Sequence, residues 1–140
     1  NLDLQQINVA IFVERLKALF SQHNLTFTNK SQWLWADPTF IEQVFINLIK
    51  NAFEADATKV EIKITEKNQY SLIKFVDNGH GLANTDNLFV PLFTTKQQGQ
   101  GIGLTFCRNI IEQHGGTIEI TNNILPQIGM TATISIPISS

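Results

Sequence analysis

Residues 37–76 decide the fold, and they read DPTFIEQVFINLIKNAFEADATKVEIKITEKNQYSLIKFV. In the first half, apolar residues recur every three or four positions to about Ala55, which predicts an amphipathic helix. Asp37 is a good N-cap and Pro38 suits the first helical position, so the helix is expected to begin there. In the second half, apolar residues alternate with polar ones, as in strands. A β-hairpin is therefore expected after the helix, with its second strand at Tyr70–Val76 and its turn at Asn68-Gln69.

The same patterns place further elements on both sides of this stretch. Residues 6–22 have helical spacing, and so do residues 101–114, where Ile102, Phe106, Ile110 and Ile111 are expected to be buried. Gly115-Gly116 is expected to end that helix, because glycine suits the position after a helix. Short strands are expected at 25–28, 33–35, 118–120 and 131–137, and a long loop at 82–100. This order of elements predicts an α+β fold with an antiparallel or mixed sheet.

The composition indicates one ordinary globular domain, residues 1–140. Hydrophobic residues make up 43% and charged residues 16% of the chain, which is enough for a core. The formal net charge of -2 argues against a nucleic-acid partner bound through its phosphates. The single cysteine, Cys107, excludes an internal disulfide and is expected to be a buried apolar residue. No apolar run reaches the ~20 residues of a transmembrane helix, and a chain that starts with Asn1 rather than Met is expected to be an excised fragment.

Asn47, Asn51 and Glu54 fall on neighbouring turns of the helix predicted after Asp37, so all three can face one cleft. An amide oxygen is a hard, neutral ligand, and it suits Mg²⁺ when phosphates supply the negative ligands. The alternative is a set of ordinary surface amides. The helix alone does not decide between these two interpretations.

Asp77-Asn78-Gly79-His80-Gly81 follows directly after the second strand of the hairpin. A carboxylate fixed at a strand end can accept a hydrogen bond from the amino group of adenine, and glycines let a ligand ring approach the backbone. The alternative is an ordinary turn, for which Asp-Asn-Gly is favourable.

The long loop and the helix after it carry two further motifs. Phe89-Val90-Pro91-Leu92-Phe93 is expected to anchor the loop, with Lys96 placed to meet a phosphate, and the alternative is a small apolar cluster under the loop. Gly99-Gln100-Gly101-Ile102-Gly103-Leu104 opens the helix, where backbone N–H groups can bind an anion. This motif differs from dinucleotide and P-loop motifs, because no strand directly precedes it and no Gly-Lys-Ser/Thr follows.

Taken in this order, the four segments closely resemble the N, G1, F and G2 boxes of the GHKL superfamily, in particular its histidine kinase branch. Ala36-Asp37-Pro38 before the first box and His114-Gly115-Gly116 after the last also match the histidine kinase pattern. The resemblance covers residues 34–137. Glu54, and a loop at 82–100 that is short for the family, are similar to the nitrogen-regulation type. The resemblance implies a two-layer α/β sandwich in which helices cover one face of a mixed sheet.

The resemblance implies a site for ATP or ADP with Mg²⁺. Asn51 would be the metal ligand, Asp77 would read the adenine, and Lys96 would contact the γ-phosphate. The catalytic residues would be Asn47, Asn51 and Lys96. The nucleotide would be bound by a larger set: Asn47, Lys50, Asn51, Glu54, Asp77, Gly79, Gly81, Leu82, Thr94, Thr95, Lys96, Gly99, Gly101, Ile102, Gly103 and Leu104. Gly129-Met130-Thr131-Ala132 departs from the family's Gly-Thr-x-Phe, so the sequence leaves the adenine-site threonine unassigned.

Asn47 favours a kinase over an ATPase, because hydrolysing relatives carry a glutamate there that activates water. An amide cannot act as that general base, and the γ-phosphoryl group would pass to a histidine instead. His23, His80 and His114 lack the setting of the family's phosphoacceptor histidine, so the chain is not expected to phosphorylate itself. Two alternatives stay open: another GHKL enzyme, either a hydrolase or a protein serine kinase, and a nucleotide-binding module without catalysis.

The resemblance also implies partners outside this chain. The acceptor histidine would lie on a dimerisation domain of the same protein, with residues 1–8 as the end of the linker from it. A response regulator would then receive the phosphoryl group. The parent would be a homodimer and this chain alone a monomer. The domain would face the cytoplasm, where ATP is found, and the sequence leaves open whether the parent is anchored in the inner membrane.

Overall fold

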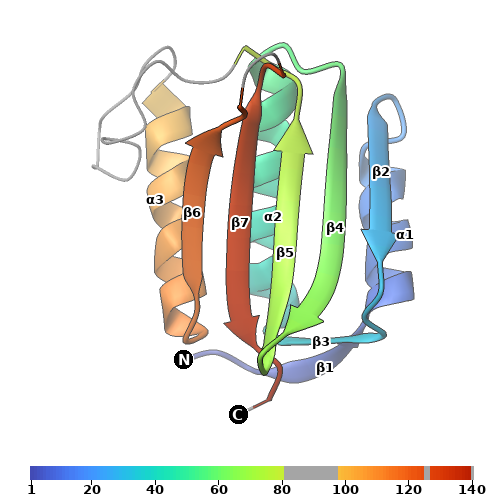
Figure 1. Ribbon diagram of the computed structural model, residues 1–140. Helices are drawn as coiled ribbons and strands as arrows, with labels where there is room; N and C mark the ends of the chain where they lie inside the picture. Colours follow the sequence, from blue (N-terminus) through green and yellow to red (C-terminus); the bar gives the residue numbers. More distant parts are fainter. Residues whose placement is uncertain (81–97, 125–126, 140) are drawn as a thin grey trace.

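The computed structural model describes residues 1–80, 98–124 and 127–139, with the backbone alone for residues 98–102. Within these ranges the helices and strands follow one another as Figure 1 shows. Their order is β1 (Gln5–Asn8), α1 (Val9–Leu19), β2 (Asn24–Asn29), β3 (Trp33–Ala36), α2 (Pro38–Glu54), β4 (Lys59–Lys67), β5 (Tyr70–Asp77), α3 (Gln98–Gln113), β6 (Thr117–Asn122) and β7 (Met130–Pro137).

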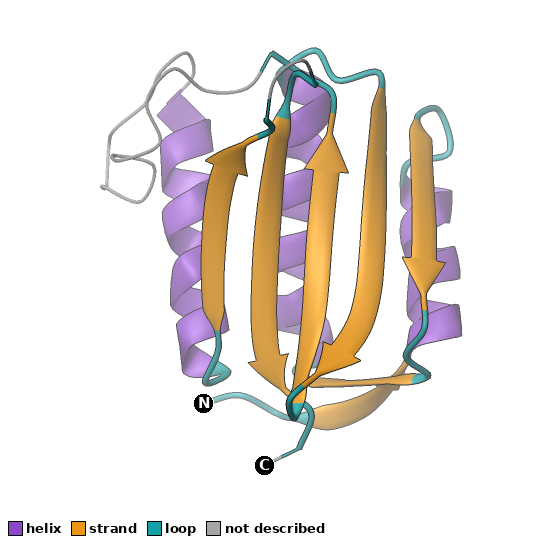
Figure 2. Cartoon of the chain, in the orientation of Figure 1, coloured by secondary structure: helices purple, strands orange, loops and turns teal. Residues whose placement is uncertain are grey.

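The described strands form one large sheet and one small one. The large sheet has five strands in the order β2-β4-β5-β7-β6, and β1 pairs with β3 in a separate antiparallel ribbon. Because β2 runs parallel to β4 while the other neighbours are antiparallel, the large sheet is mixed. The helices α1, α2 and α3 all lie against one face of it (Figure 2). The two-layer sandwich with a mixed sheet is therefore confirmed.

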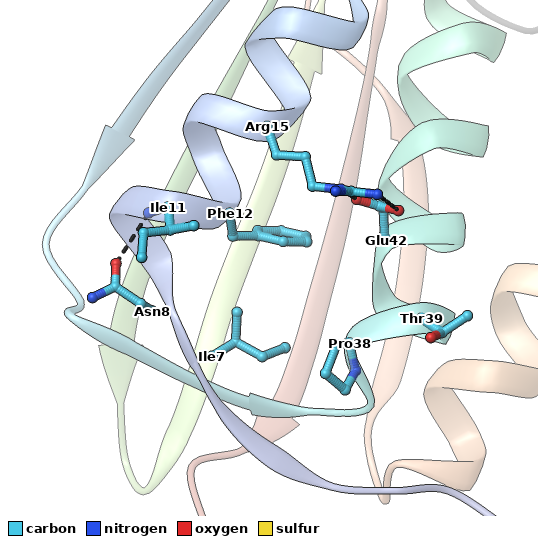
Figure 3. A pocket seen from close by; sticks show the side chains of 8 residues that line it. All are labelled: Ile7, Asn8, Ile11, Phe12, Arg15, Pro38, Thr39 and Glu42. Atoms are coloured by element: carbon cyan, nitrogen blue, oxygen red, sulfur yellow. Dashed lines mark hydrogen bonds and ion pairs between the residues drawn. The ribbon is translucent and has the colours of Figure 1, made fainter.

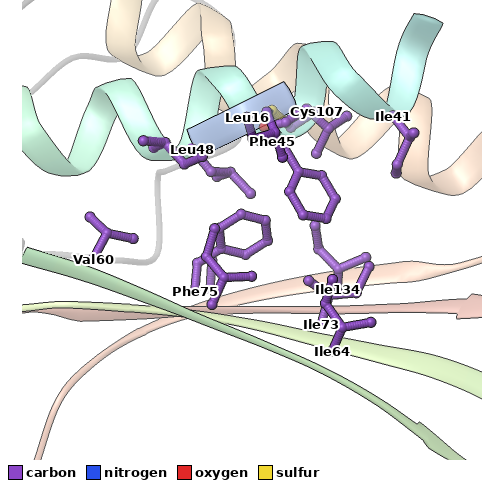
Figure 4. Close-up of a cluster of buried hydrophobic side chains, with 14 of the residues drawn as sticks. Leu16, Ile41, Phe45, Leu48, Val60, Ile64, Ile73, Phe75, Cys107 and Ile134 are labelled. Carbon is purple, nitrogen blue, oxygen red and sulfur yellow. The ribbon is translucent and has the colours of Figure 1, made fainter. Parts of the chain in front are cut away.

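The core lies between the helices and the sheet, and α2 runs along its middle. Phe45 of α2 is fully buried, and its ring meets the rings of Phe12 and Phe75 edge-on, with centroid distances of 4.9 Å in both pairs. Isoleucines of the sheet, Ile73 and Ile134 among them, complete the layer below Phe45 (Figure 4). Each such side chain contributes about 1.5–3 kcal/mol on burial, so this contact fixes α2 on the sheet.

Helix α2 begins where the sequence predicts. Asp37 Oδ1 accepts hydrogen bonds from the backbone N–H groups of Thr39 and Phe40, at 3.0 and 3.1 Å. Pro38 occupies the first helical position and the helix ends at Glu54. None of the described helices, α2 included, has the length and apolar character needed to cross a bilayer. The amides of the first motif thus lie in the last turns of α2, at the end of the molecule where β5 also ends.

Helix α3 begins at Gln98, three residues earlier than expected, and stops as predicted. Gly115 takes a positive φ of 81°, and the backbone N–H of Gly116 donates to the carbonyl of Ile111 at 3.0 Å. The prediction that Phe106 is buried is wrong, because this side chain is 37% exposed. The buried residues of α3 recur every three or four positions, and Phe106 falls outside that row: Leu104, Cys107, Ile110 and Ile111. The side chain of Ile102 lies outside the described residues.

The helical interpretation of residues 6–8 is wrong, because β1 occupies residues 5–8 and α1 starts at Val9. Ile7 lies opposite Leu34 in the ribbon. Asn8 ends the strand and caps the helix, since its Oδ1 accepts a hydrogen bond from Ile11 N at 3.0 Å. The partner strand is distant in sequence, so the spacing of apolar residues gave no sign of it. That residues 1–8 end a linker stays a prediction.

Candidate functional site

Four elements meet at one end of the molecule: the last turns of α2, the end of β5, the start of β7 and the first turns of α3 (Figure 1). A small pocket lies among them, lined by Leu48, Asn51, Ala52, Val60, Phe75, Asp77, Leu104, Met130 and Ala132. Asn51 and Asp77 are the polar residues in this set. The pocket is otherwise apolar, so the polar groups of a ligand there would have to pair with these two side chains.

Asp77 is the buried acid of this pocket, with 9% of its surface exposed. Its Oδ1 accepts hydrogen bonds from the backbone N–H groups of Gly79 at 2.9 Å and Met130 at 3.2 Å. Burial raises the pKa of Asp77 above the ordinary value of an aspartate, although the two backbone donors and the charge of His80 act in the opposite direction. Since Oδ1 takes both backbone donors, Oδ2 is the oxygen that can accept a hydrogen bond from a ligand.

Two residues that contact the backbone carbonyl of Asp77 were not predicted from the sequence as parts of the site. The Nδ2 group of Asn123 donates to the backbone carbonyl of Asp77 at 3.0 Å. Gly129 has a positive φ of 111°, and a Cβ atom there would stand 2.0 Å from the same carbonyl. Glycine is therefore required at position 129. The 46-residue separation between Asp77 and Asn123 explains why no local pattern indicated this support.

The Asp-Asn-Gly turn joins the end of β5 to the end of α2. A Cβ atom at Gly79 would stand 2.6 Å from the carbonyl oxygen of Ala55, so the turn needs glycine to approach α2. Asn78 Oδ1 accepts hydrogen bonds from the backbone N–H groups of Thr58 and Lys59, at 2.8 and 3.1 Å. The fold itself thus explains why position 79 is a glycine. The close approach of a ligand to its backbone stays a prediction.

The polar residues of α2 divide between two faces. Asn51 is 8% exposed and lines the pocket of Asp77. Asn47 donates from Nδ2 to the carbonyl of Gln43 at 3.0 Å, and its Oδ1 faces Gly103 of α3, 3.5 Å from where a Cβ atom would stand. Lys50 and Glu54 are exposed instead and line a different, open pocket together with Phe20, His23 and Phe53. The structure therefore brings Asn47, Asn51 and Asp77 to one end of the fold and turns Lys50 and Glu54 to another face.

Part of the predicted site cannot be placed. Gly81, Leu82, Thr94, Thr95 and Lys96 lie outside the described residues, as does the Phe89–Phe93 anchor. Gly99, Gly101 and Ile102 are placed by their backbone in the first turns of α3, and Leu104, 1% exposed, lines the pocket. The helix N-terminus thus lies beside the pocket.

Residues 129–132, the Gly-Met-Thr-Ala segment that differs from the family pattern, do not all line the pocket. Met130 and Ala132 line the pocket. The hydroxyl of Thr131 instead donates to Asn123 Oδ1 at 2.6 Å. The pocket therefore presents a thioether side chain and a methyl group at these positions.

A larger hollow lies at the opposite end of α2, and its volume is about 530 Å³. Figure 3 shows that it is bounded by α1, β1 and the first turn of α2, with an ion pair between Arg15 and Glu42 at its side. Its lining holds none of the predicted site residues: Ile7, Asn8, Ile11, Phe12, Arg15, Pro38, Thr39 and Glu42. Pocket size alone therefore does not identify the candidate site. The buried acid Asp77 and the buried amide Asn51 identify it.

Residues 36–140 match the family described as histidine kinase-, DNA gyrase B-, and HSP90-like ATPase. The match takes in most of the chain and every element of the site just described. The chain belongs to this family.

Curated relatives narrow the similarity to sensor kinases. Sporulation kinase D of Bacillus subtilis (strain 168) is 35% identical over 104 residues, covering 71% of this chain and 20% of that protein. Sensor histidine kinase ZraS of Escherichia coli (strain K12) is 38% identical over 108 residues, covering 74% of this chain and 23% of that protein. The chain thus spans about a fifth to a quarter of the length of these relatives.

Solved structures agree on the fold. The catalytic domain of histidine kinase ThkA has a TM-score of 0.85 and 29% identity, covering 99% of this chain and 97% of that one. ThkA in complex with the response regulator protein TrrA gives a TM-score of 0.78 and 27% identity, covering 96% of this chain and 42% of that one. Because the match to the catalytic domain of ThkA runs almost end to end, the chain has the fold of a histidine kinase catalytic domain.

The donor set at the pocket fits a nucleotide with a hydrated cation. The Nδ2 atom of Asn51 is buried and has no hydrogen-bond partner among the described residues. A buried amide atom without a partner is unfavourable by about 1–3 kcal/mol, which a ligand can offset. Turning the amide by half a rotation presents its oxygen to the same place, where a cation could bind. One neutral protein ligand suits Mg²⁺, which keeps several waters and takes its negative ligands from phosphates.

Proposed function

We propose that this chain binds Mg-ATP and donates the γ-phosphoryl group to a histidine on a separate dimerisation domain, as part of a two-component sensor histidine kinase. The observation that carries the proposal is the arrangement of Asn47, Asn51 and the buried Asp77 beside the N-terminus of α3. The similarity to sensor histidine kinases supports a kinase role in two-component signalling.

Asp77 would read the adenine ring. Its Oδ1 already accepts from two backbone donors, and Oδ2, which accepts no hydrogen bond from the described residues, would accept one from the exocyclic amino group. A base with a carbonyl at that position has no such donor and would meet a carboxylate oxygen instead. The apolar walls, formed by Leu48, Phe75 and Met130 among others, would cover the faces of the ring. This arrangement favours adenine over guanine.

The phosphates would lie toward the N-terminus of α3. The unpaired backbone N–H groups of a helix N-terminus attract anions, and Gly99, Gly101 and Gly103 leave room there for phosphate oxygens. Asn51 would hold Mg²⁺, which neutralises phosphate charge when bound. Lys96, outside the described residues, is proposed as a further γ-phosphate contact.

Asn47 supports transfer over hydrolysis. Its amide has no basic atom that could take a proton from water, and its Nδ2 group is engaged with the carbonyl of Gln43. Without a base, water attacks slowly, and the γ-phosphoryl group stays available for a better nucleophile that a partner brings in line. A hydrolase, the first alternative, would need a base from elsewhere.

The acceptor histidine is proposed to lie in another domain. The ring of His23 stacks on Phe53 with a centroid distance of 4.3 Å. Both ring nitrogens of His114 are engaged inside the fold. His80 is in the turn after β5. We therefore expect no self-phosphorylation by this chain, a dimerisation domain as its direct partner, a homodimeric parent, and a response regulator as the next acceptor. A response regulator is the partner of ThkA in one of the matching structures.

Calorimetry with ADP, with and without Mg²⁺, tests the binding step. Asp77→Ala is expected to weaken ADP binding at least about tenfold, the loss of one hydrogen bond to a charged group. Asn51→Ala is expected to lose the Mg²⁺-dependent part of the affinity and keep the rest. Glu66→Ala, an exposed acid on β4, is the matched control and should bind like the wild type. Wild-type binding by Asp77→Ala would contradict the adenine assignment, and unchanged metal dependence in Asn51→Ala would contradict the ligand role.

A further inference from the structure

Helices α2 and α3 pack side by side in opposite directions, so their pair has two distinct ends. At one end Asn47 of α2 faces Gly103 of α3, and this end holds the candidate site. At the other end Asp37, just before α2, meets His114, just after α3. These two residues are 5% and 7% exposed. The function of the site does not by itself require a buried histidine at its far end.

The two ring nitrogens of His114 have fixed and different roles. Nε2 lies 3.1 Å from the backbone nitrogen of Asp37, which can only donate, so Nε2 must accept. Nδ1 lies 2.8 Å from the backbone carbonyl of Ile110, which can only accept, so Nδ1 must carry the proton and donate. The ring is therefore neutral, and it joins the last turn of α3 to the residue that starts α2.

Asp37 connects this contact to a third segment. Its Oδ1 caps α2 through the N–H groups of Thr39 and Phe40. Its Oδ2 accepts a hydrogen bond from the backbone N–H of Asp3 at 2.8 Å. One residue thus holds the segment before β1, the start of α2 and the end of α3 together. We call the hydrogen bond between Asp37 and His114 the clasp.

The interface between the helices is continuous from the clasp to the site. Cys107 of α3 is fully buried, and its thiol lies 3.9 Å from the backbone carbonyl of Val44 in α2. One turn further along, Asn47 meets Gly103 with no side chain between them. Helices are stiff over this length, so a shift or rotation at the clasp is passed to the other end of the pair.

We propose that His114 is a positioning residue: through the clasp it sets the placement of α3 against α2, and thereby the fit of the phosphate-binding helix start to Asn47 and Asn51. This inference rests on the proposed function of the site. Asp77 lies on β5 and is held by Gly79 and Met130 rather than by α3. Loss of the clasp should therefore disturb the phosphate end of a nucleotide and spare the adenine end.

Two substitutions separate the clasp from the other hydrogen bond of His114. In His114→Gln the side-chain oxygen takes the place of Nε2 and can still accept from Asp37, while the donor to Ile110 is lost. In His114→Asn the side-chain nitrogen takes the place of Nδ1 and can still donate to Ile110, while the reach to Asp37 is lost. Ile64→Val in β4 is the control for a mild loss of stability, because Ile64 is fully buried and does not line the pocket.

The first measurement compares the affinities of AMP and of AMPPNP with Mg²⁺ in the 140-residue chain. His114→Asn is expected to weaken AMPPNP about ten- to hundredfold, the effect of losing a hydrogen bond to a charged phosphate group, and to change AMP less than about twofold. His114→Gln and Ile64→Val should keep the wild-type ratio of the two affinities. Equal weakening of AMP and AMPPNP in His114→Asn, or equal effects of the two His114 variants, would overturn the proposal.

Hydrogen exchange without nucleotide tests the clasp separately from the proposed function. In His114→Asn the backbone amides of residues 103–107 should exchange faster, while those of β5 and β7 stay protected. His114→Gln should leave residues 103–107 as in the wild type. If the wild type binds neither nucleotide, the proposed function fails, and the exchange comparison still decides the clasp: unchanged protection of residues 103–107 in His114→Asn would overturn it.

Discussion

Asp77 is held in an environment that makes its charge unfavourable. Burial raises its pKa, two backbone donors satisfy Oδ1, and the residue lines a mostly apolar pocket. A fixed carboxylate of this kind can discriminate strongly, because a ligand without a donor leaves a buried charge unpaired. The same burial that would give selectivity therefore lowers the stability of the domain without ligand.

The Asp77→Asn substitution tests both the effect on stability and the effect on ligand affinity. Because the folded pKa is raised, the ionised carboxylate lowers stability at pH values above the folded pKa, and the penalty is absent below the unfolded value of about 3.9. The variant should therefore melt a few degrees above the wild type at pH 7 and no higher at pH 3.5. Its ADP affinity should fall at least about tenfold, because an N–H replaces the accepting Oδ2. Thermal melts without nucleotide and calorimetry with ADP check this, and a less stable variant at pH 7 would contradict it.

At the scale of elements, the start of α2 and the end of α3 were predicted correctly from the sequence, while contacts between distant residues were not predicted. Asp37 and Pro38 start α2 and Gly115 ends α3, because caps and glycine conformations depend on neighbours within a few residues. β1 was taken for helix, since its pairing with β3 depends on residues far along the chain. Asn123 and Gly129, which support Asp77, could not be predicted for the same reason.

Asp37 shows how one cap affects the stability of α2. The hydrogen bond from Asp3 is the main cause that lowers the pKa of Asp37, followed by those from Phe40 and Thr39, against burial. A lowered folded pKa gives stability that is present above the unfolded value of about 3.9 and is lost as pH falls through the folded pKa.

We therefore expect Asp37→Ala to lose about 1–2 kcal/mol at pH 7, the range for removal of an N-cap. Asp37→Asn should lose less, because its amide oxygen still caps the helix. Below pH 4 the wild type should approach Asp37→Asn in stability, since protonation removes the charge that separates them. Denaturant unfolding at pH 7 and pH 3 measures this. If Asp37→Asn were as unstable as Asp37→Ala at pH 7, the helix cap would not be the source of the stability that Asp37 contributes.

At the scale of the whole molecule, the candidate site lies at one end of the fold, and the acceptor histidine is proposed to lie in another domain. The resemblance carried by the four motifs in their order was enough to predict the two-layer sandwich. The order of strands and the parallel pairing of β2 with β4 were not predictable, because alternation of apolar residues does not name a partner strand. Lys50 and Glu54 share the helix of Asn51 yet face elsewhere, which depends on how α2 sits on the sheet.

Phosphoryl transfer without hydrolysis of ATP is the activity proposed for this chain. The most direct test incubates it with Mg²⁺ and γ-labelled ATP, in the presence of separately produced helices that carry the proposed acceptor histidine. We expect acid-labile label on the added helices, none on the chain itself, and none on either with Asn51→Ala. Steady release of inorganic phosphate at the same rate with and without the helices, with no labelled protein, would contradict it.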